Sequence, residues 1–200
     1  MPQFPLDKNP FSVDLDELYR RVVVTGSGSA SLTGTETLTN KTLSAPTISN
    51  PLINNAVLDA AASTLALSQA SHDGKTIKLN RSAGIACTLP AATGSGFRIR
   101  LVVVTALSAA NYTVAVANSS DYMRGTSFST QDAADTALMF DTADTGTVAT
   151  ESDTITLNGT TTGGVVGTIV ELEDIAANLW VVRITNKASG AEATPFSVAV

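Results

Sequence analysis

The residues of this chain that could do chemistry are few. It has one histidine, His72, which lies next to Ser71 and just before Asp73 and Gly74, a pair typical of turns. A nucleophilic serine needs a positioned base, and no Gly-x-Ser-x-Gly motif surrounds this one. A histidine that acts as a general acid or base needs a second group within hydrogen-bond reach, and no motif supplies it. We therefore expect no catalytic role for His72.

The single cysteine, Cys87, lies in the apolar run GIACTLP. One cysteine allows neither an intrachain disulfide nor a cysteine zinc cluster. A reactive thiol is one interpretation, but cysteine is among the most frequently buried residue types. The run therefore predicts a buried cysteine in a β-strand.

Acidic residues gather late in the chain, where they could pair as acid and base or bind calcium through oxygen atoms. Their spacing matches no EF-hand loop, and no other feature marks a sugar-binding cleft. We therefore expect a polar loop region, no metal, no cofactor and no enzymatic activity. The residues are Asp132, Asp135, Asp141, Asp144, Glu151 and Asp153.

A strand followed by Gly-x-Gly in VVVTGSGSA raises the possibility of a dinucleotide site. Gly26 and Gly28 fit that fingerprint, but Ser31 stands where the third small residue belongs. No helical pattern follows, and the acidic residue expected further on is missing. The stretch is better interpreted as a flexible joint.

Charge and hydropathy exclude two kinds of partner. The 200 residues carry a formal net charge of −6, and the twelve basic residues form no run. Nucleic-acid phosphates require clustered lysine and arginine, so we expect no nucleic-acid binding. No apolar stretch approaches the ~18 residues that span a bilayer, and the N-terminus lacks the pattern of a signal peptide. We therefore expect no membrane association.

The chain divides into three predicted segments. Residues 1–24 begin with the proline-rich MPQFPLDKNPF, which should be extended, and continue with one short amphipathic helix in SVDLDELYRRV. A helix this short needs a surface to pack on. Residues 25–62 form an extended connector, and residues 63–200 form a β-rich domain.

The connector is periodic. Aliphatic residues recur every five positions, at Leu38, Leu43, Ile48, Ile53 and Leu58. A flat strand would send successive members to opposite faces, and two prolines in the row oppose a helix. No isolated element buries this row, whereas a segment that turns regularly, or that winds around copies of itself, could bury it.

Short apolar runs separated by turn signals predict the β domain. Strands are expected at TLAL, KTIKLN, GIACTLP, FRIRLVVVT, YTVAVA, TALMF, TVATESDTITLN, VVGTIVEL, NLWVVRIT and PFSVAV. This spacing, without alternating helices, predicts an all-β antiparallel sandwich or barrel of jelly-roll-like form. In FRIRLVVVT, alternate residues from Phe97 form an apolar face, and Arg98 and Arg100 lie on the opposite face. There the arginines would meet a carboxylate, a partner or solvent.

The stretch TETLTNKTLSAPTISNP resembles the Leu-Thr-Asn-Lys-Thr-Leu segments of bacteriophage tail-fibre and head-surface proteins. The stretch GKTIKLNRSAGIACTLPAATGSGFRIRLVVVT, with the later ITLNGTTTGGVVGT and LWVVRIT, is similar to a small β module of phage virion proteins. It resembles capsid-decorating proteins, also called cement or head-fibre proteins. The two similarities together cover roughly residues 35–185.

This resemblance implies a non-enzymatic homotrimer that decorates and stabilises the capsid surface after assembly in the host cytoplasm. Its partners would be copies of itself and the major capsid protein or another virion protein. The pentad row would then supply trimer contacts. Residues 1–24 would be the capsid anchor, through Phe4, Phe11, Leu15, Leu18, Tyr19, Arg20 and Arg21.

Two rival interpretations remain open. A small tail-fibre or adhesin subunit that binds a host receptor would also have an N-terminal anchor and a trimeric β head. A fragment of a depolymerase would need an acidic pair in a cleft and has the least support.

Overall fold

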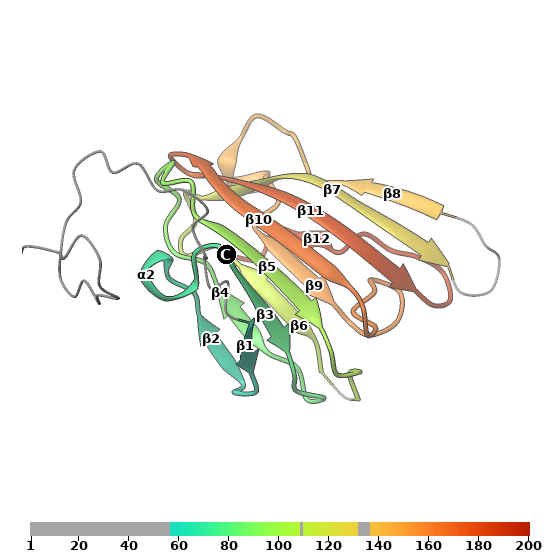
Figure 1. Cartoon of the computed structure of the whole chain (residues 1–200). Coiled ribbons are helices and arrows are strands. Elements are labelled where there is room, and N and C mark those ends of the chain that lie inside the picture. Colours follow the sequence, from blue (N-terminus) through green and yellow to red (C-terminus); the bar gives the residue numbers. More distant parts are fainter. Residues whose placement is uncertain (1–56, 109, 132–136) are drawn as a thin grey trace, which may run out of the picture. The chain divides into compact units, whose positions relative to one another are not determined.

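The computed structural model describes residues 57–108, 110–131 and 137–200 (Figure 1). The proposed capsid anchor and the first four members of the pentad row lie outside the described residues. The fifth member, Leu58, lies inside them.

Two β-sheets enclose one hydrophobic core. The first, which we call sheet A, has seven strands and the second, sheet B, has five. In spatial order, sheet A consists of β1 (Val57–Ala60), β3 (Lys75–Leu79), β5 (Arg98–Val103), β10 (Ile169–Ala176), β11 (Leu179–Ala188), β7 (Tyr122–Gln131) and β8 (Ala137–Asp141). Sheet B consists of β12 (Phe196–Ser197), β9 (Thr154–Leu157), β6 (Tyr112–Ala115), β4 (Ala86–Thr88) and β2 (Thr64–Ala66).

The first six strands alternate between the two sheets. β1, β3 and β5 pair in parallel in sheet A, and β2, β4 and β6 pair in parallel in sheet B. The chain therefore winds as a coil, with one strand of each sheet in every turn. No long helix is needed to connect these parallel neighbours, because the return strand lies in the opposite sheet.

The remaining strands are mostly antiparallel. β10 pairs antiparallel with both β5 and β11, and β9 with both β6 and β12, while β11 and β7 are parallel. The all-β prediction is confirmed, and the two sheets are compatible with a sandwich. The predicted antiparallel pairing holds for only some of the strands, since each sheet contains both parallel and antiparallel pairs.

The core follows the alternation of the strands. In β5, Phe97 just before the strand and then Ile99, Leu101 and Val103 are at most 3% exposed, which confirms the predicted apolar face. The ring of Phe97 meets that of Trp180 edge-on at 5.8 Å between centroids. Each large side chain buried in this way contributes roughly 1.5–3 kcal/mol to the hydrophobic stabilisation.

Two strands of sheet A were missed by the sequence patterns. β1 lies inside the predicted connector, so the sheet begins at Val57, upstream of the predicted domain start at residue 63. β7 is long but polar, and its inward positions include Gly125, Ser127 and Ser129. Without an apolar alternation, sequence inspection had no signal for this strand.

Two short helical turns complete the described structure: α2 (Gln69–His72) and the 3-10 turn η1 (Val148–Thr150). Among the residues that the structure describes, no helix is long and apolar enough to cross a membrane.

Candidate functional site

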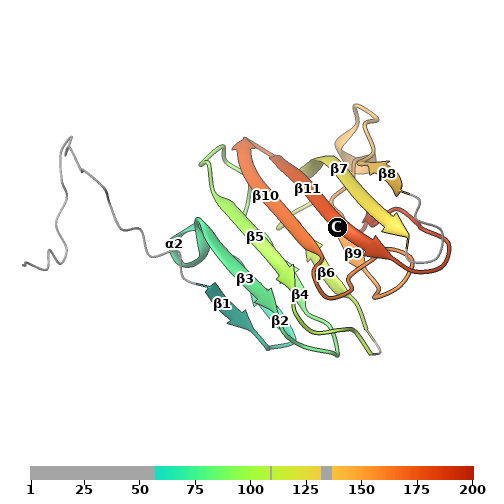
Figure 2. The same ribbon diagram turned by 45° about the vertical axis from the view of Figure 1, so that its right-hand side comes forward.

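A groove of about 580 Å³ lies on the outer face of sheet A, over β3, β5, β10 and β11. These strands lie side by side in Figure 2. The groove is lined by Gly74, Lys75, Thr76, Arg98, Ile99, Arg100, Glu171, Leu172, Glu173, Val181 and Arg183. Its charged residues come from four strands that only the folded sheet brings together.

Two arginine–glutamate pairs cross the groove between β5 and β10. Arg98 donates to the Glu173 carboxylate at 2.6 Å, and Arg100 lies 3.8 Å from the Glu171 carboxylate. Both pairs follow from the strand register, which places each arginine opposite its glutamate. The hydrogen bond from Arg98 to Glu173 raises the pKa of the arginine. Arg98 and Arg100 therefore each meet a carboxylate, which is one of the three surroundings that the sequence allows for them.

Arg183 extends one of these pairs across the sheet. The register places it opposite Glu171 on β11, so Arg100, Glu171 and Arg183 form one row. The side chain of Arg183 forms no hydrogen bond or ion pair with any residue that the structure describes. It is therefore the arginine of the groove that is most available to a ligand.

The groove is a cationic surface on an acidic chain. Its lining has four cationic side chains and two carboxylates, whereas the whole chain has a net charge of −6. Such a surface suits a ligand that carries carboxylate groups, since a guanidinium binds them with two parallel hydrogen bonds. No nucleophile and base face each other among the lining residues.

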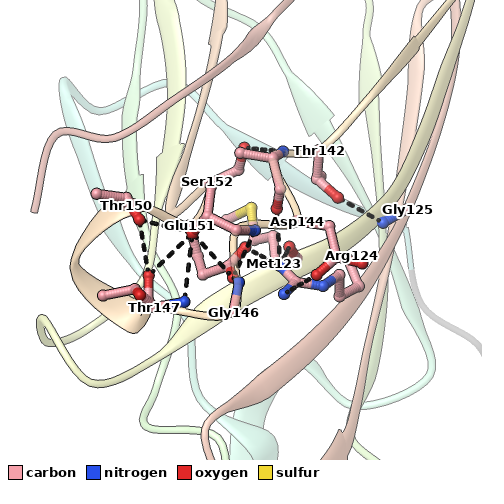
Figure 3. A network of polar contacts seen from close by, with 12 residues as sticks. Met123, Arg124, Gly125, Thr142, Asp144, Gly146, Thr147, Thr150, Glu151 and Ser152 are labelled. Atoms are coloured by element: carbon pink, nitrogen blue, oxygen red, sulfur yellow. Dashed lines mark hydrogen bonds and ion pairs between the residues drawn. The ribbon is translucent and has the colours of Figure 1, made fainter.

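A second polar cluster holds the loop between β8 and β9 (Figure 3). Arg124 on β7 donates to the carboxylate of Glu151, to Asp144 at 3.0 Å and to the carbonyl of Ala143 at 2.8 Å. The guanidinium carbon also lies 4.8 Å from the centroid of the Tyr122 ring. One arginine thus ties three points of the loop to the sheet.

Glu151 is the centre of this loop cluster and is only 2% exposed to solvent. Besides the hydrogen bond from Arg124, it accepts backbone N–H groups from Thr145 at 3.0 Å and Gly146 at 2.8 Å. The hydrogen bond from Arg124 is the main cause that lowers the pKa of Glu151 to about 2, against the opposing effect of burial. Glu151 is therefore held as a carboxylate, which suits a structural anchor and not a proton donor.

Asp174 performs a similar task at the loop before β5. Its carboxylate accepts the backbone N–H groups of Thr93, Gly94 and Ser95, and the Ser95 hydroxyl at 2.7 Å. Burial alone would raise the pKa of Asp174, but these donors outweigh it and lower the pKa. The carboxylate fixes a loop with two glycines at positive φ, Gly94 and Gly96.

Asp153 holds the end of the chain. Its two carboxylate oxygens accept the backbone N–H groups of Ala199 at 2.8 Å and Val200 at 3.1 Å. Asp153 is only 5% exposed to solvent. The last residues are thus fixed beside β9.

His72 and Cys87, the histidine and the cysteine of the chain, are not placed beside groups that would activate them among the described residues. The Nδ1 atom of His72 lies 3.0 Å from the backbone nitrogen of Ser68, at the start of its own helical turn. Cys87 is buried in β4, as predicted, and burial raises the pKa of its thiol to about 12.

The predicted acidic region is divided by the fold. Asp144 and Glu151 share Arg124, Asp153 binds the chain end, and Asp141 is exposed on β8. Asp132 and Asp135 lie outside the described residues. In the described ranges, no group of three or more histidine, cysteine, aspartate or glutamate residues is placed to hold a metal ion.

Leu58 is the one predicted trimer contact that the structure describes. It lies on β1 opposite Ile77 and packs, partly buried, against the core of its own domain. The remaining predicted contacts and the anchor residues lie outside the described part of the chain.

Sequence inspection missed Arg183 and Arg124 as members of these clusters. Neither lies in a motif, and their charged partners are 12 or more residues away along the chain, on other strands or loops. Only strand register could have revealed them.

Comparison of the chain with protein-family models, with curated proteins and with solved structures finds no match.

Proposed function

We propose that this chain is a non-enzymatic structural protein of a bacteriophage particle. It decorates and stabilises the capsid as a homotrimer and is anchored through residues 1–24. The observation that carries the proposal is the resemblance of TETLTNKTLSAPTISNP to segments of phage head-surface and tail-fibre proteins.

The way the β domain uses its carboxylates supports a structural role. Glu151, Asp153 and Asp174 each bind backbone N–H groups of loops or of the chain end. These bonds fix the connections of the sandwich, and a rigid domain of this kind suits a protein exposed on a particle. A carboxylate so engaged is a poor acid or base, because its charged form is already stabilised.

The anchor follows from composition. Phe4, Phe11, Leu15, Leu18 and Tyr19 are too few to form a core of their own. Packed against a capsid, each would contribute roughly 1.5–3 kcal/mol before the cost of ordering. Three arms on one trimer would bind together, so their combined affinity would exceed that of one arm by orders of magnitude.

The experiment has two steps. Light scattering on the purified full chain should give about three times the monomer mass of 20.5 kDa. Phage particles stripped of the protein should then bind the full trimer and not a trimer that lacks residues 1–24. A monomer in the first step, or full binding by the truncated trimer in the second, would contradict the corresponding part of the proposal.

The groove on sheet A favours one second candidate function, that of an adhesin that binds a receptor of the host. Arg183 lies free among the described residues in a groove with excess positive charge. Host surfaces carry carboxylate groups that such a groove suits.

This candidate is tested by binding of the purified chain to host cells. Arg183→Glu should reduce cell binding strongly in a receptor-binding protein, and Lys187→Glu, on the same strand but outside the groove lining, serves as the matched control. Equal cell binding by the two variants would count against an adhesin that uses this groove.

A further inference from the structure

A small patch of four side chains lies on the outer face of sheet A, at the end of the groove nearest β7. It consists of Arg183 and Thr185 on β11 with Thr126 and Phe128 on β7, which are neighbouring parallel strands (Figure 2). The register places Arg183 beside Thr126 and Thr185 beside Phe128. On each strand the residue between the two is buried, so all four side chains point outward. We call these four residues the Arg183 patch.

The dimensions of the Arg183 patch suit one sugar ring better than a peptide. Neighbouring strands lie about 4.8 Å apart, and two residues along a strand span about 6.6 Å, which is close to the size of a single ring. A peptide that adds a strand needs free backbone groups at a sheet edge. Here both strands are paired on both sides, β7 with β11 and β8, and β11 with β10 and β7. The patch therefore offers a ligand side chains and not backbone groups.

The side chains of the patch are available to a ligand. Arg183 is exposed, and the hydroxyls of Thr126 and Thr185 form no hydrogen bond with any residue that the structure describes. Phe128 is 42% exposed, so part of its ring faces solvent. A guanidinium binds a carboxylate, threonine hydroxyls exchange hydrogen bonds with sugar hydroxyls, and the C–H groups of a sugar ring pack on the negative face of an aromatic ring. A sugar that carries a carboxylate would use all three kinds of contact.

The charges around the patch indicate where such a carboxylate would lie. One row across the outer face of sheet A consists, in order, of Arg100, Glu171, Arg183, Thr126 and Asp141. Positive and negative charges alternate along this row except at Thr126, which is neutral. A ligand carboxylate near Thr126 is attracted by Arg183 and repelled by the exposed Asp141. The carboxylate therefore lies on the side of Thr126 that faces Arg183.

We propose that the Arg183 patch binds a uronic-acid residue of an acidic polysaccharide, with its carboxylate on Arg183 and its ring against Phe128. In a uronic acid the carboxylate is attached to the ring itself, so the two contacts must lie as close together as Arg183 and Phe128 do. The hydroxyls of Thr126 and Thr185 then bind the hydroxyls of the ring. This inference rests on the adhesin candidate of the proposed function, and it names the class of receptor that the adhesin would recognise.

Isothermal titration of the full chain with oligogalacturonate and with hyaluronan oligosaccharides tests this inference. Both contain uronic acids, with different ring stereochemistry, and at least one of them should bind. Its methyl ester keeps the ring but removes the charge, and should bind at least about tenfold more weakly. Arg183→Gln should weaken binding of the acid by a similar factor, whereas Lys187→Gln, which neutralises an exposed cation on the same strand, should not.

Three results of this titration overturn the proposal. They are no binding of either acid, equal binding of acid and ester, and equal weakening by the two variants. A polyglutamate peptide that binds as tightly as the oligosaccharide also overturns it, because the patch would then recognise a carboxylate without the sugar ring.

Two further variants test the ring contact and the position of the carboxylate. Phe128→Ala should weaken binding several-fold, and Ile175→Ala, which truncates an exposed apolar side chain on β10, is its control. Asp141→Asn should strengthen binding, because it removes the repulsion of the ligand carboxylate. Unchanged binding in Phe128→Ala, or weaker binding in Asp141→Asn, contradicts the proposed orientation of the sugar.

Binding to host cells reports separately on the adhesin candidate. If the oligosaccharide binds as expected but the chain does not bind host cells, the adhesin candidate fails and the sugar site stands. If host cells bind the chain through Arg183 but neither oligosaccharide binds, the adhesin candidate stands and the sugar class is wrong.

Discussion

The guanidinium of Arg124 on β7 donates to the carboxylate of Glu151, which lies 27 residues further along the chain and is almost fully buried. This contact joins β7, the neighbour of the edge strand β8 in sheet A, to the loop that leads into β9. A buried pair of this kind is sensitive to the loss of one partner, because the other charge is left without compensation.

The Arg124–Glu151 pair predicts an acid-sensitive component of stability. The pKa of Glu151 is lowered from its ordinary value of 4.5 to about 2, so the folded state binds the proton more weakly than the unfolded state. The stabilisation is therefore fully present above about pH 4.5 and is lost as the pH falls towards about 2. Thermal unfolding followed over this range should show a smaller acid-dependent loss in Glu151→Gln than in the native chain, because Asp174, whose pKa is also lowered, still contributes in the variant.

The matched control for this prediction is Glu171→Gln, which removes the looser and more exposed pair with Arg100. Exposed pairs contribute about 0.2–1 kcal/mol, so this variant should keep the acid-dependent component. An unchanged pH profile in Glu151→Gln would show that the pair does not cause it.

Asp174 should be important for stability through its hydrogen bonds. Asp174→Ala leaves the N–H groups of Thr93, Gly94 and Ser95 without their acceptor, which should cost on the order of 3 kcal/mol. Chemical denaturation measures this, with Asp141→Ala as the exposed control. If Asp174→Ala lowers the free energy of unfolding by less than Asp141→Ala does, water replaces the carboxylate as the acceptor of these N–H groups.

Gly125 should not tolerate a side chain. A Cβ atom there would lie 1.7 Å from the carbonyl oxygen of Val182 on the neighbouring strand, at a backbone φ of 152°. Gly125→Ala should therefore destabilise the domain by on the order of 3 kcal/mol. Gly190→Ala also places a side chain at positive φ, but in open space, and should cost about 1–2 kcal/mol. Equal melting temperatures for the two variants would contradict the close approach of β7 and β11.

Cys87 should be chemically inert in the folded chain. Its thiol is buried and has a pKa of about 12, so very little thiolate exists at mildly alkaline pH. A thiol reagent should react with it only after denaturation, which absorbance follows directly. Rapid reaction of the folded chain would mean that β4 opens readily.

The sequence predicted those elements whose side chains alternate clearly. The faces of β5 and the burial of Cys87 could be predicted because apolar and polar residues alternate or cluster there. β7 could not, since serine and glycine at its inward positions resemble a loop. The parallel pairing of β1, β3 and β5 could not be predicted either, because alternation specifies which face is buried and not which strands are neighbours.

Less of the candidate site than of the fold can be predicted from the sequence. Arg98 and Arg100 were recognised as a pair on one face, but Arg183 joins them only through the register of β10 and β11. The late carboxylates were expected in a polar loop, and the fold instead buries Glu151 and Asp153 against backbone N–H groups. Those partners carry no signal in the sequence.

The central claim is that this chain decorates the capsid of a phage, and its position on intact particles tests that claim most directly. An antibody against the β domain, coupled to gold, should label the head of each particle at many sites when viewed by electron microscopy. Label confined to the tail, or particles without label, would contradict the claim.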